Sequence, residues 1–327
     1  MASRSMQAFE TLDSLGSKRD QGEQPSSHRQ VQQAQRPAGR GWRSREEEEE
    51  EEQEEGQLRE EYVEVGPLGE GSYGSVYSGY RRTDRLPVAI KHIAKPDVVY
   101  MRLILGGRVR QVPLEVVLLL KAGAGAEPGS VGSTAAVTLV DWFDLSDELV
   151  LVLERPVPSM DLIAYLEARG GHIQECEAKI IMKQLVDAAM EIEAKGVFHR
   201  DIKLENVLVE TGSDVPRVRL IDFGFGRVMR EGAYTQASGT PAYTPPEWYQ
   251  RGSYRAGPTT VWQLGVLMFG LLAGRLPFDT GRQIVHKKAK LGNGFSRNCQ
   301  DFLRRCLTKC PDRRFTLERL QLHPWLD

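Results

Sequence analysis

The segment His199-Arg200-Asp201-Ile202-Lys203-Leu204-Glu205-Asn206 decides the fold, because three of its side chains suit one chemical task. Asp201 can accept a hydroxyl proton, Lys203 can stabilise a phosphate in transfer, and Asn206 can offer an amide oxygen to magnesium. Taken one at a time, such residues are also common in turns and caps.

Asp222-Phe223-Gly224 follows sixteen residues after Asn206 and adds a carboxylate at a turn. Magnesium prefers carboxylate and amide oxygens together with phosphate, so we predict that Asn206 and Asp222 bind the metal. When the motifs are taken together and in order, chance turn chemistry becomes a poor explanation of them.

A glycine-rich segment, Leu68-Gly69-Glu70-Gly71-Ser72-Tyr73-Gly74-Ser75-Val76, lies near the start of the patterned sequence between two predicted strands. Without side chains, its backbone can approach phosphates closely. By itself the pattern also fits a tight hairpin. A strand on each side argues against a dinucleotide-binding turn, which would open into a helix.

Val88-Ala89-Ile90-Lys91 places an ammonium group at the end of an apolar strand, where an unpaired charge is costly to bury. Glu115, early in the next predicted helix, and nucleotide phosphates would compensate it. A structural ion pair without nucleotide remains the alternative.

Together these motifs, with Pro245-Pro246-Glu247, resemble the protein-kinase signature over roughly residues 62–326. The chain resembles the Pim family of serine/threonine kinases in five further segments: Val112-Pro113-Leu114-Glu115-Val116-Val117-Leu118-Leu119, Asp141-Trp142-Phe143, Glu154-Arg155-Pro156-Val157-Pro158, Tyr243-Thr244-Pro245-Pro246-Glu247-Trp248 and His323-Pro324-Trp325.

The resemblance implies an α+β, bilobal kinase fold at 61–326. A small antiparallel β-rich N-lobe with one helix (about 61–153) would be joined by a hinge (154–158) to a larger, mainly α C-lobe (159–326). ATP and Mg²⁺ would bind between the lobes. Asp201, Lys203 and Asn206 would be catalytic. Nucleotide contacts would come from Leu68, Gly69, Glu70, Gly71, Ser72, Tyr73, Gly74, Val76, Ala89, Lys91, Glu115, Glu154 and Asp222.

The hinge and the catalytic loop carry two finer expectations. Pro156 has no N–H, so adenine would keep one hinge hydrogen bond, to the carbonyl of Glu154. Lys203, with Thr240 beside it, is similar to the arrangement in serine/threonine kinases, so tyrosine substrates are not expected.

The chain also departs from the Pim pattern. Asp161 and Glu205 match acidic positions that read arginines upstream of the target hydroxyl, but five other such positions are not acidic, and we expect a weaker preference for basic substrates. They are Val157, Ala164, Leu204, Gly270 and Arg275.

The activation segment and the following helix differ as well. Arg200 lacks an acidic partner where Gln236 and Ser238 stand, so phosphorylation of Ser238 or Thr235 is one hypothesis for ordering the segment, and an ordinary loop serine is the other. Thr260-Val261-Trp262 stands where most kinases have an aspartate, and the resemblance implies that the Pim group shares this loss.

Local patterns predict strands at 62–68, 75–80, 87–93, 137–142 and 148–153, and a helix over 115–121 with Pro113 in its first turn. Helices are also expected at 259–272, 298–307 and 316–320, and along the apolar stripe of Ile181, Leu185, Ala188 and Ile192.

Residues 1–60 are polar and contain a run of glutamates from Glu46, so we expect a disordered tail that acts as a solvated linker or as a docking arm. With 43 basic and 45 acidic residues and four cysteines, the chain points to a reducing compartment and to no obligatory nucleic acid. No signal peptide is seen, and the apolar run 261–273 is too short to cross a bilayer. We expect a monomer in the cytoplasm and also the nucleus, acting on protein substrates. A pseudokinase or scaffold that uses the acidic tail is the alternative.

Overall fold

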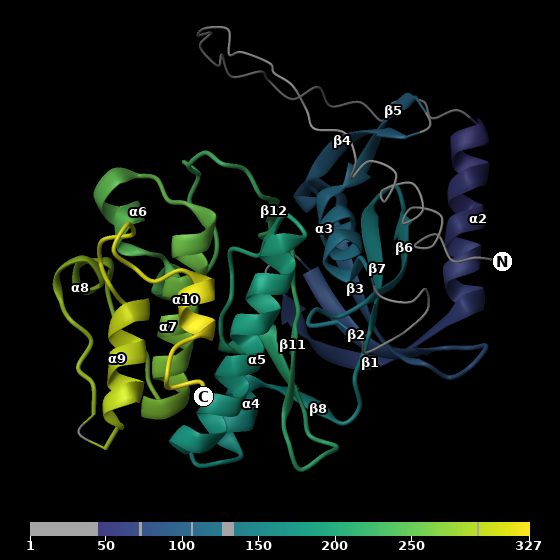
Figure 1. Ribbon diagram of the computed structural model, residues 1–327. Helices are drawn as coiled ribbons and strands as arrows, with labels where there is room; N and C mark the ends of the chain where they lie inside the picture. The colour runs from purple at the N-terminus through teal and green to yellow at the C-terminus, as the bar shows by residue number, and fades with distance from the viewer. Residues whose placement is uncertain (1–44, 72–73, 106, 126–133, 293) are drawn as a thin grey trace, which may run out of the picture.

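The computed structural model describes residues 45–71, 74–105, 107–125, 134–292 and 294–327. Two lobes lie side by side, one built around an antiparallel sheet and one mainly of helices (Figure 1). This confirms the predicted α+β, bilobal architecture.

The N-lobe contains a five-stranded sheet in the order β1-β2-β3-β7-β6, with antiparallel neighbours. Successive side chains of a strand point to opposite faces of the sheet. In β3, Val88 and Ile90 point to one face, and Lys91 and Ile93 point to the other. The strands confirm the five predicted ones: β1 Tyr62–Gly71, β2 Gly74–Arg81, β3 Pro87–Ala94, β6 Leu139–Asp144 and β7 Glu148–Glu154.

Helix α3, Leu114–Gly123, is the predicted N-lobe helix, and Pro113 precedes it as the N-cap. Its side chains are buried on nearly every side because the helix lies between the sheet and the C-lobe. A hairpin of β4 (Tyr100–Leu105) and β5 (Arg108–Pro113) leads into it and was not predicted. Gly107, at φ 77°, follows β4 and supplies the left-handed residue that the turn requires.

The C-lobe is organised around two long helices, α5 (Glu175–Ala194) and α7 (Ala256–Ala273). The predicted apolar stripe on α5 is buried, from Ile181 to Ile192. Its other elements are β8 Ser159–Asp161, α4 Leu162–Glu167, β9 Val197–Phe198, η2 Leu204–Asn206, β10 Val207–Glu210, β11 Arg217–Leu220, β12 Arg227–Val228, η3 Pro241–Tyr243, α6 Pro246–Arg251, α8 Gly281–His286, α9 Arg297–Cys306 and α10 Leu317–Gln321. A short helical turn of the N-lobe, η1, spans Lys95–Asp97.

Among the described residues, helix α7 is long and apolar enough to cross a membrane by length and composition alone, but 83% of its 18 residues are buried inside the protein. Helices α5 and α9 pack on it. Helix α7 is thus a core helix of the C-lobe, and it begins before the predicted helix at 259–272.

The prediction of a disordered tail is wrong for residues 45–60, which belong to helix α2 (Arg45–Glu61) at the edge of the N-lobe (Figure 1). Glutamate, glutamine, leucine and arginine are good helix formers. Leu58 packs against the apolar cluster around Phe143, and the Arg82 guanidinium donates to the Arg59 carbonyl. Residues 1–44 lie outside the described part of the chain.

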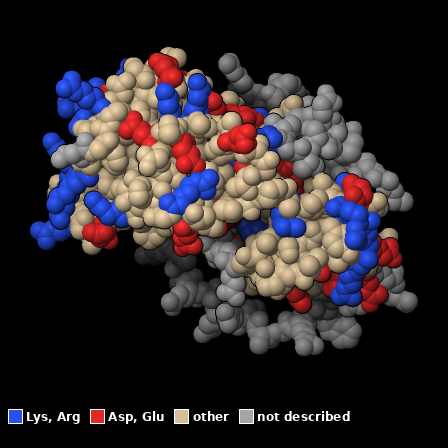
Figure 2. Space-filling model, turned by 90° about the horizontal axis from the view of Figure 1, so that it is seen from below, with Lys and Arg blue, Asp and Glu red and all other residues tan. Residues whose placement is uncertain are grey.

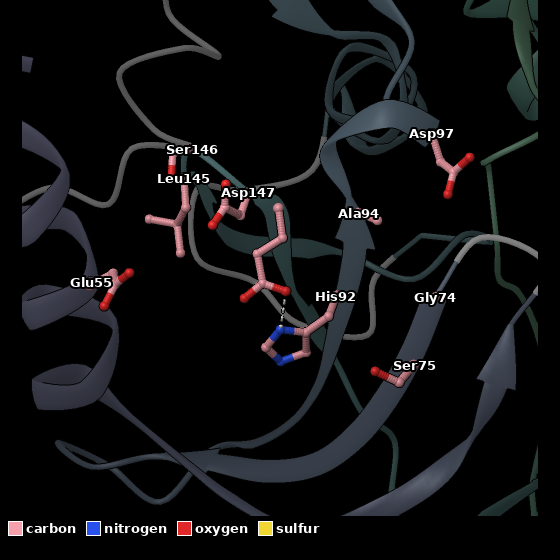
Figure 3. A pocket seen from close by; sticks show the side chains of 10 residues that line it. Glu55, Gly74, Ser75, His92, Ala94, Asp97, Leu145, Ser146 and Asp147 are labelled. Atoms are coloured by element: carbon pink, nitrogen blue, oxygen red, sulfur yellow. Dashed lines mark hydrogen bonds and ion pairs between the residues drawn. The ribbon is translucent and has the colours of Figure 1, made fainter. Parts of the chain in front are cut away.

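A cavity of about 720 Å³ lies between helix α2 and the sheet. His92 projects into it and contacts Glu148, and Glu55 faces it from the helix (Figure 3). Because neighbouring residues of a strand point to opposite faces, His92 points away from the face that carries Lys91. Of the residues that line this cavity, only Gly74 belongs to the nucleotide site that the sequence predicts.

The C-lobe contains a buried ion pair between Arg314 and Glu247, with two parallel hydrogen bonds of 2.9 and 2.8 Å. Both side chains are almost fully inaccessible, at 0% and 3% exposed. The pair ties helix α6 to the segment between α9 and α10.

Replacement Glu247→Gln should lower the free energy of unfolding by about 3–5 kcal/mol, because it leaves a buried guanidinium without its counter-charge. Urea unfolding of the purified protein measures this. Arg255→Gln breaks an exposed pair with Asp312 and should cost about 1 kcal/mol or less. Equal losses in the two variants would contradict the argument.

Candidate active site

Lys91 is the centre of a charge cluster between the lobes. Its Nζ lies 2.8 Å from Oε1 of Glu115 on helix α3 and 2.8 Å from Oδ1 of Asp222. The Lys91 side chain is only 5% exposed. Strand β3, helix α3 and the segment after β11 thus converge on one ammonium group.

The protonation states of this cluster follow from burial and charge together. Burial works against the charged lysine, but the two carboxylates outweigh it and raise the pKa of Lys91. Burial would raise the pKa of Asp222, but Lys91 outweighs it and lowers that pKa. Both groups are therefore charged at neutral pH, and Asp222 presents an ionised oxygen to the cleft.

The catalytic-loop residues form a second cluster around Asp201. Asn206 donates to its Oδ2 over 3.1 Å, and the backbone N–H of Thr240 donates to its Oδ1 over 2.7 Å. Lys203 Nζ lies 3.1 Å from the Asp201 carboxylate and 2.9 Å from the Thr240 hydroxyl. The predicted neighbourhood of Lys203 and Thr240 is present.

His199 links the two clusters. One ring nitrogen lies 3.0 Å from the carbonyl of Ile221, and the other accepts from the Asp201 N–H at 3.3 Å. Burial lowers the pKa of His199, so the ring is neutral and donates to the carbonyl. Its ring also contacts Phe223, with centroids 4.7 Å apart.

Each of the two clusters has a residue with a strained backbone conformation in it or next to it. Arg200 and Asp222 have φ values of 70° and 62°, a left-handed conformation that costs a non-glycine residue about 1–3 kcal/mol. Gly239 lies against this strained loop, since an added Cβ would come 2.7 Å from the Arg200 carbonyl. The surrounding contacts hold the chain in this shape.

The glycine-rich segment forms the β1–β2 hairpin, with Gly69 opposite Val76 and Gly71 opposite Gly74. An added Cβ at Gly74 would meet the His92 carbonyl at 1.7 Å, whereas Gly69 faces open space. Ser72 and Tyr73 lie outside the described residues, as does the side chain of Glu70.

Three apolar residues of the predicted nucleotide site border this hairpin. Val76 is paired with Lys91 in the sheet register, and Ala89 lies two residues before Lys91. Val76, Ala89 and Lys91 therefore share one face of the sheet. Leu68 in β1 is half exposed.

The Glu154 side chain at the predicted hinge is buried against Arg219 of strand β11, an ion pair that the sequence did not predict. Burial lowers the pKa of Arg219 to about 10. The Glu154 N–H donates to the Thr138 carbonyl over 2.9 Å. The Glu154 side chain is thus structural, and a nucleotide contact there would use its backbone.

Arg200 has more partners than the sequence suggested. Its guanidinium donates to the Tyr254 hydroxyl at 2.6 and 3.1 Å and to the carbonyl of Gln236 at 3.2 Å. The Tyr254 hydroxyl in turn donates to the Gln236 carbonyl. Tyr234 pairs with Tyr254 through two backbone hydrogen bonds, and their rings stack. Neutral oxygens thus hold the activation segment on Arg200.

The assembled site defines a class of protein. A model of the protein kinase domain matches residues 62–326, and the chain therefore belongs to the protein kinase family. The serine/threonine-protein kinase pim-2 of Danio rerio is 37% identical over 271 residues, which are 82% of this chain and 86% of that protein.

Two other relatives are also serine/threonine-protein kinases. The serine/threonine-protein kinase prk-2 of Caenorhabditis elegans is 33% identical over 83% of this chain and 59% of its own length. A PAS domain-containing serine/threonine-protein kinase of Mus musculus is 28% identical over 83% of this chain and 19% of its own length. This chain is a Pim-like serine/threonine protein kinase.

Replacement Tyr254→Phe should reduce kcat, because hydrogen bonds to a charged group contribute about 1.5–3 kcal/mol and hold the activation segment on Arg200. Peptide phosphorylation after phosphatase treatment measures this. Ser238→Ala should match the parent protein in the same assay, since no phosphate is needed for the contacts seen. Loss of activity on phosphatase treatment alone would restore the phosphorylation hypothesis.

Proposed function

We propose that this kinase binds ATP with Mg²⁺ between its lobes and transfers the γ-phosphate to serine and threonine hydroxyls of protein substrates. The observation that supports this most strongly is the pairing of Lys91 with both Glu115 and Asp222 next to an Asp201 carboxylate fixed by Lys203 and Asn206. Two ammonium groups, three carboxylates and an amide suit phosphoryl transfer, which depends on positioning and charge.

The side chains present fit magnesium. Asn206 donates through Nδ2 to the carbonyl and to the carboxylate of Asp201, so its Oδ1 is the amide atom that suits a cation. Asp222 supplies an ionised oxygen. Among the described residues no group of three or more His, Cys, Asp or Glu side chains could hold a metal. The metal would take its other ligands from phosphate and water, as Mg²⁺ commonly does.

In this proposal each residue has one task. Lys91 and Asp222 orient the phosphates and the metal, and Mg²⁺ would neutralise charge that develops on them. Asp201 orients the acceptor hydroxyl and takes its proton as the new oxygen–phosphorus bond forms, while the bond from the γ-phosphorus to the bridging oxygen breaks and ADP leaves. Lys203, held by Thr240, stabilises the phosphate in transfer. Adenine would accept one hinge bond fewer than usual because Pro156 lacks an N–H.

We also propose a reduced preference for basic substrates. Leu204 is only 5% exposed, and Gly270 leaves room for it, since a Cβ there would lie 3.2 Å from Leu204 Cδ1. An apolar contact thus occupies two positions where the family resemblance places carboxylates. Asp161 is used as the N-cap of helix α4, and Glu205 is exposed.

The remaining expectations are that the protein is a monomer that works in the cytoplasm and the nucleus. Acidic and basic side chains lie interspersed on the face shown in Figure 2, which favours protein partners over nucleic acid. A scaffold without catalysis is the competing proposal, and helix α2 with its glutamate run would then be the contact surface.

Replacement Asp201→Asn should abolish transfer from radiolabelled ATP to a degenerate peptide library while ATP still binds, because Lys91 and Asp222 are unchanged. Phosphate transfer and nucleotide affinity are measured side by side. If the parent protein binds Mg-ATP and transfers no phosphate, the scaffold proposal is favoured.

Replacement Leu204→Asp should increase the preference for upstream arginine about fivefold, because one charge-assisted hydrogen bond contributes about 1 kcal/mol where solvent is partly excluded. The ratio of kcat/KM for arginine and alanine peptides measures this. Glu205→Gln should lower the same ratio. A parent protein that already depends strongly on upstream arginine would contradict the proposed preference.

A further inference from the structure

Gln263 contacts the backbone on both sides of the predicted proton acceptor. Its side-chain carbonyl accepts from the N–H of Ile202 over 3.3 Å, and its amide donates to the carbonyl of Arg200 over 2.6 Å. Asp201 lies between these two residues in the chain. Gln263 is 3% exposed and belongs to helix α7, the buried core helix of the C-lobe.

We propose that Gln263 is a positioning residue that fixes the Asp201 backbone on the rigid core of the C-lobe. Other residues hold the Asp201 carboxylate itself, namely Asn206, Lys203 and the Thr240 N–H. Gln263 acts on the backbone and not on the carboxylate, because its hydrogen bonds determine where the main chain that carries this carboxylate lies.

Two observations explain why such a support is needed. Arg200 adopts a left-handed conformation with φ 70°, which persists only when the surroundings hold it. Helix α7 has the sequence AGPTTVWQLGVLMFGLLA and therefore contains no carboxylate that could bind the loop. A carboxamide suits the task, because it donates to one backbone group and accepts from the other.

Positioning is distinguishable from a purely structural contribution. A displaced proton acceptor slows the chemical step but leaves the Lys91, Glu115 and Asp222 cluster intact, so nucleotide binding should stay the same. A structural role would lower stability and affect nucleotide binding and transfer together. The proposal rests on the phosphate transfer described above.

The test uses Gln263→Met, which keeps the side-chain length and removes both hydrogen bonds. We expect the single-turnover rate of phosphate transfer to fall about 10- to 100-fold, since a shift near 1 Å can cost that much. The KM for ATP should remain within about twofold of the parent value, because its ligands are untouched. Rapid-quench measurements with saturating peptide give the rate.

Thr259→Val is the matched control on the same helix. The Thr259 Oγ1 is buried and has no hydrogen-bond partner among the described residues, so removing it changes polarity without breaking a contact to the loop. Its transfer rate should equal that of the parent. An unchanged rate in Gln263→Met, or parallel losses of rate and ATP binding in that variant, would overturn the proposal. A parent protein without transfer would instead refute the proposed function.

Discussion

The buried charge of Lys91 is the interaction on which the rest of the site depends. An ammonium group with a 5% exposed side chain is tolerable only with compensating carboxylates, and these come from helix α3 and from the segment after β11. The sheet, the helix and the C-lobe must therefore meet in one geometry. The same requirement brings Asp222 to the cleft in its ionised form.

Much of the fold could be predicted because its signals are local. The five sheet strands, helix α3, the apolar stripe of α5 and the core helix α7 follow from alternation, from helical periodicity and from the proline before α3. The β4–β5 hairpin was missed, although Gly106-Gly107 between two β-like runs was a usable turn signal. Helix α2 was missed because composition suggested disorder and Leu58 alone signals its packing.

For the site, the sequence could predict which residues take part, because their types occur in a known order, but it could not predict all of their contacts. Motif order correctly brought Lys91, Glu115 and Asp222 together, and likewise Asp201, Lys203, Asn206 and Thr240. The contacts of Arg200 with Tyr254 and of Gln263 with the catalytic loop join residues more than fifty positions apart. No periodicity or spacing encodes such pairs, because the packing of whole helices creates them.

The two glycines Gly69 and Gly74 differ in whether the protein itself excludes a side chain. At Gly74 the neighbouring strand itself excludes a Cβ, through the His92 carbonyl, whether or not any nucleotide binds. At Gly69 the protein leaves open space. A descendant of this gene that lost catalysis would therefore retain the first constraint and be released from the second, so that a replaced Gly69 beside a retained Gly74 would be an informative sign of an inactive paralogue.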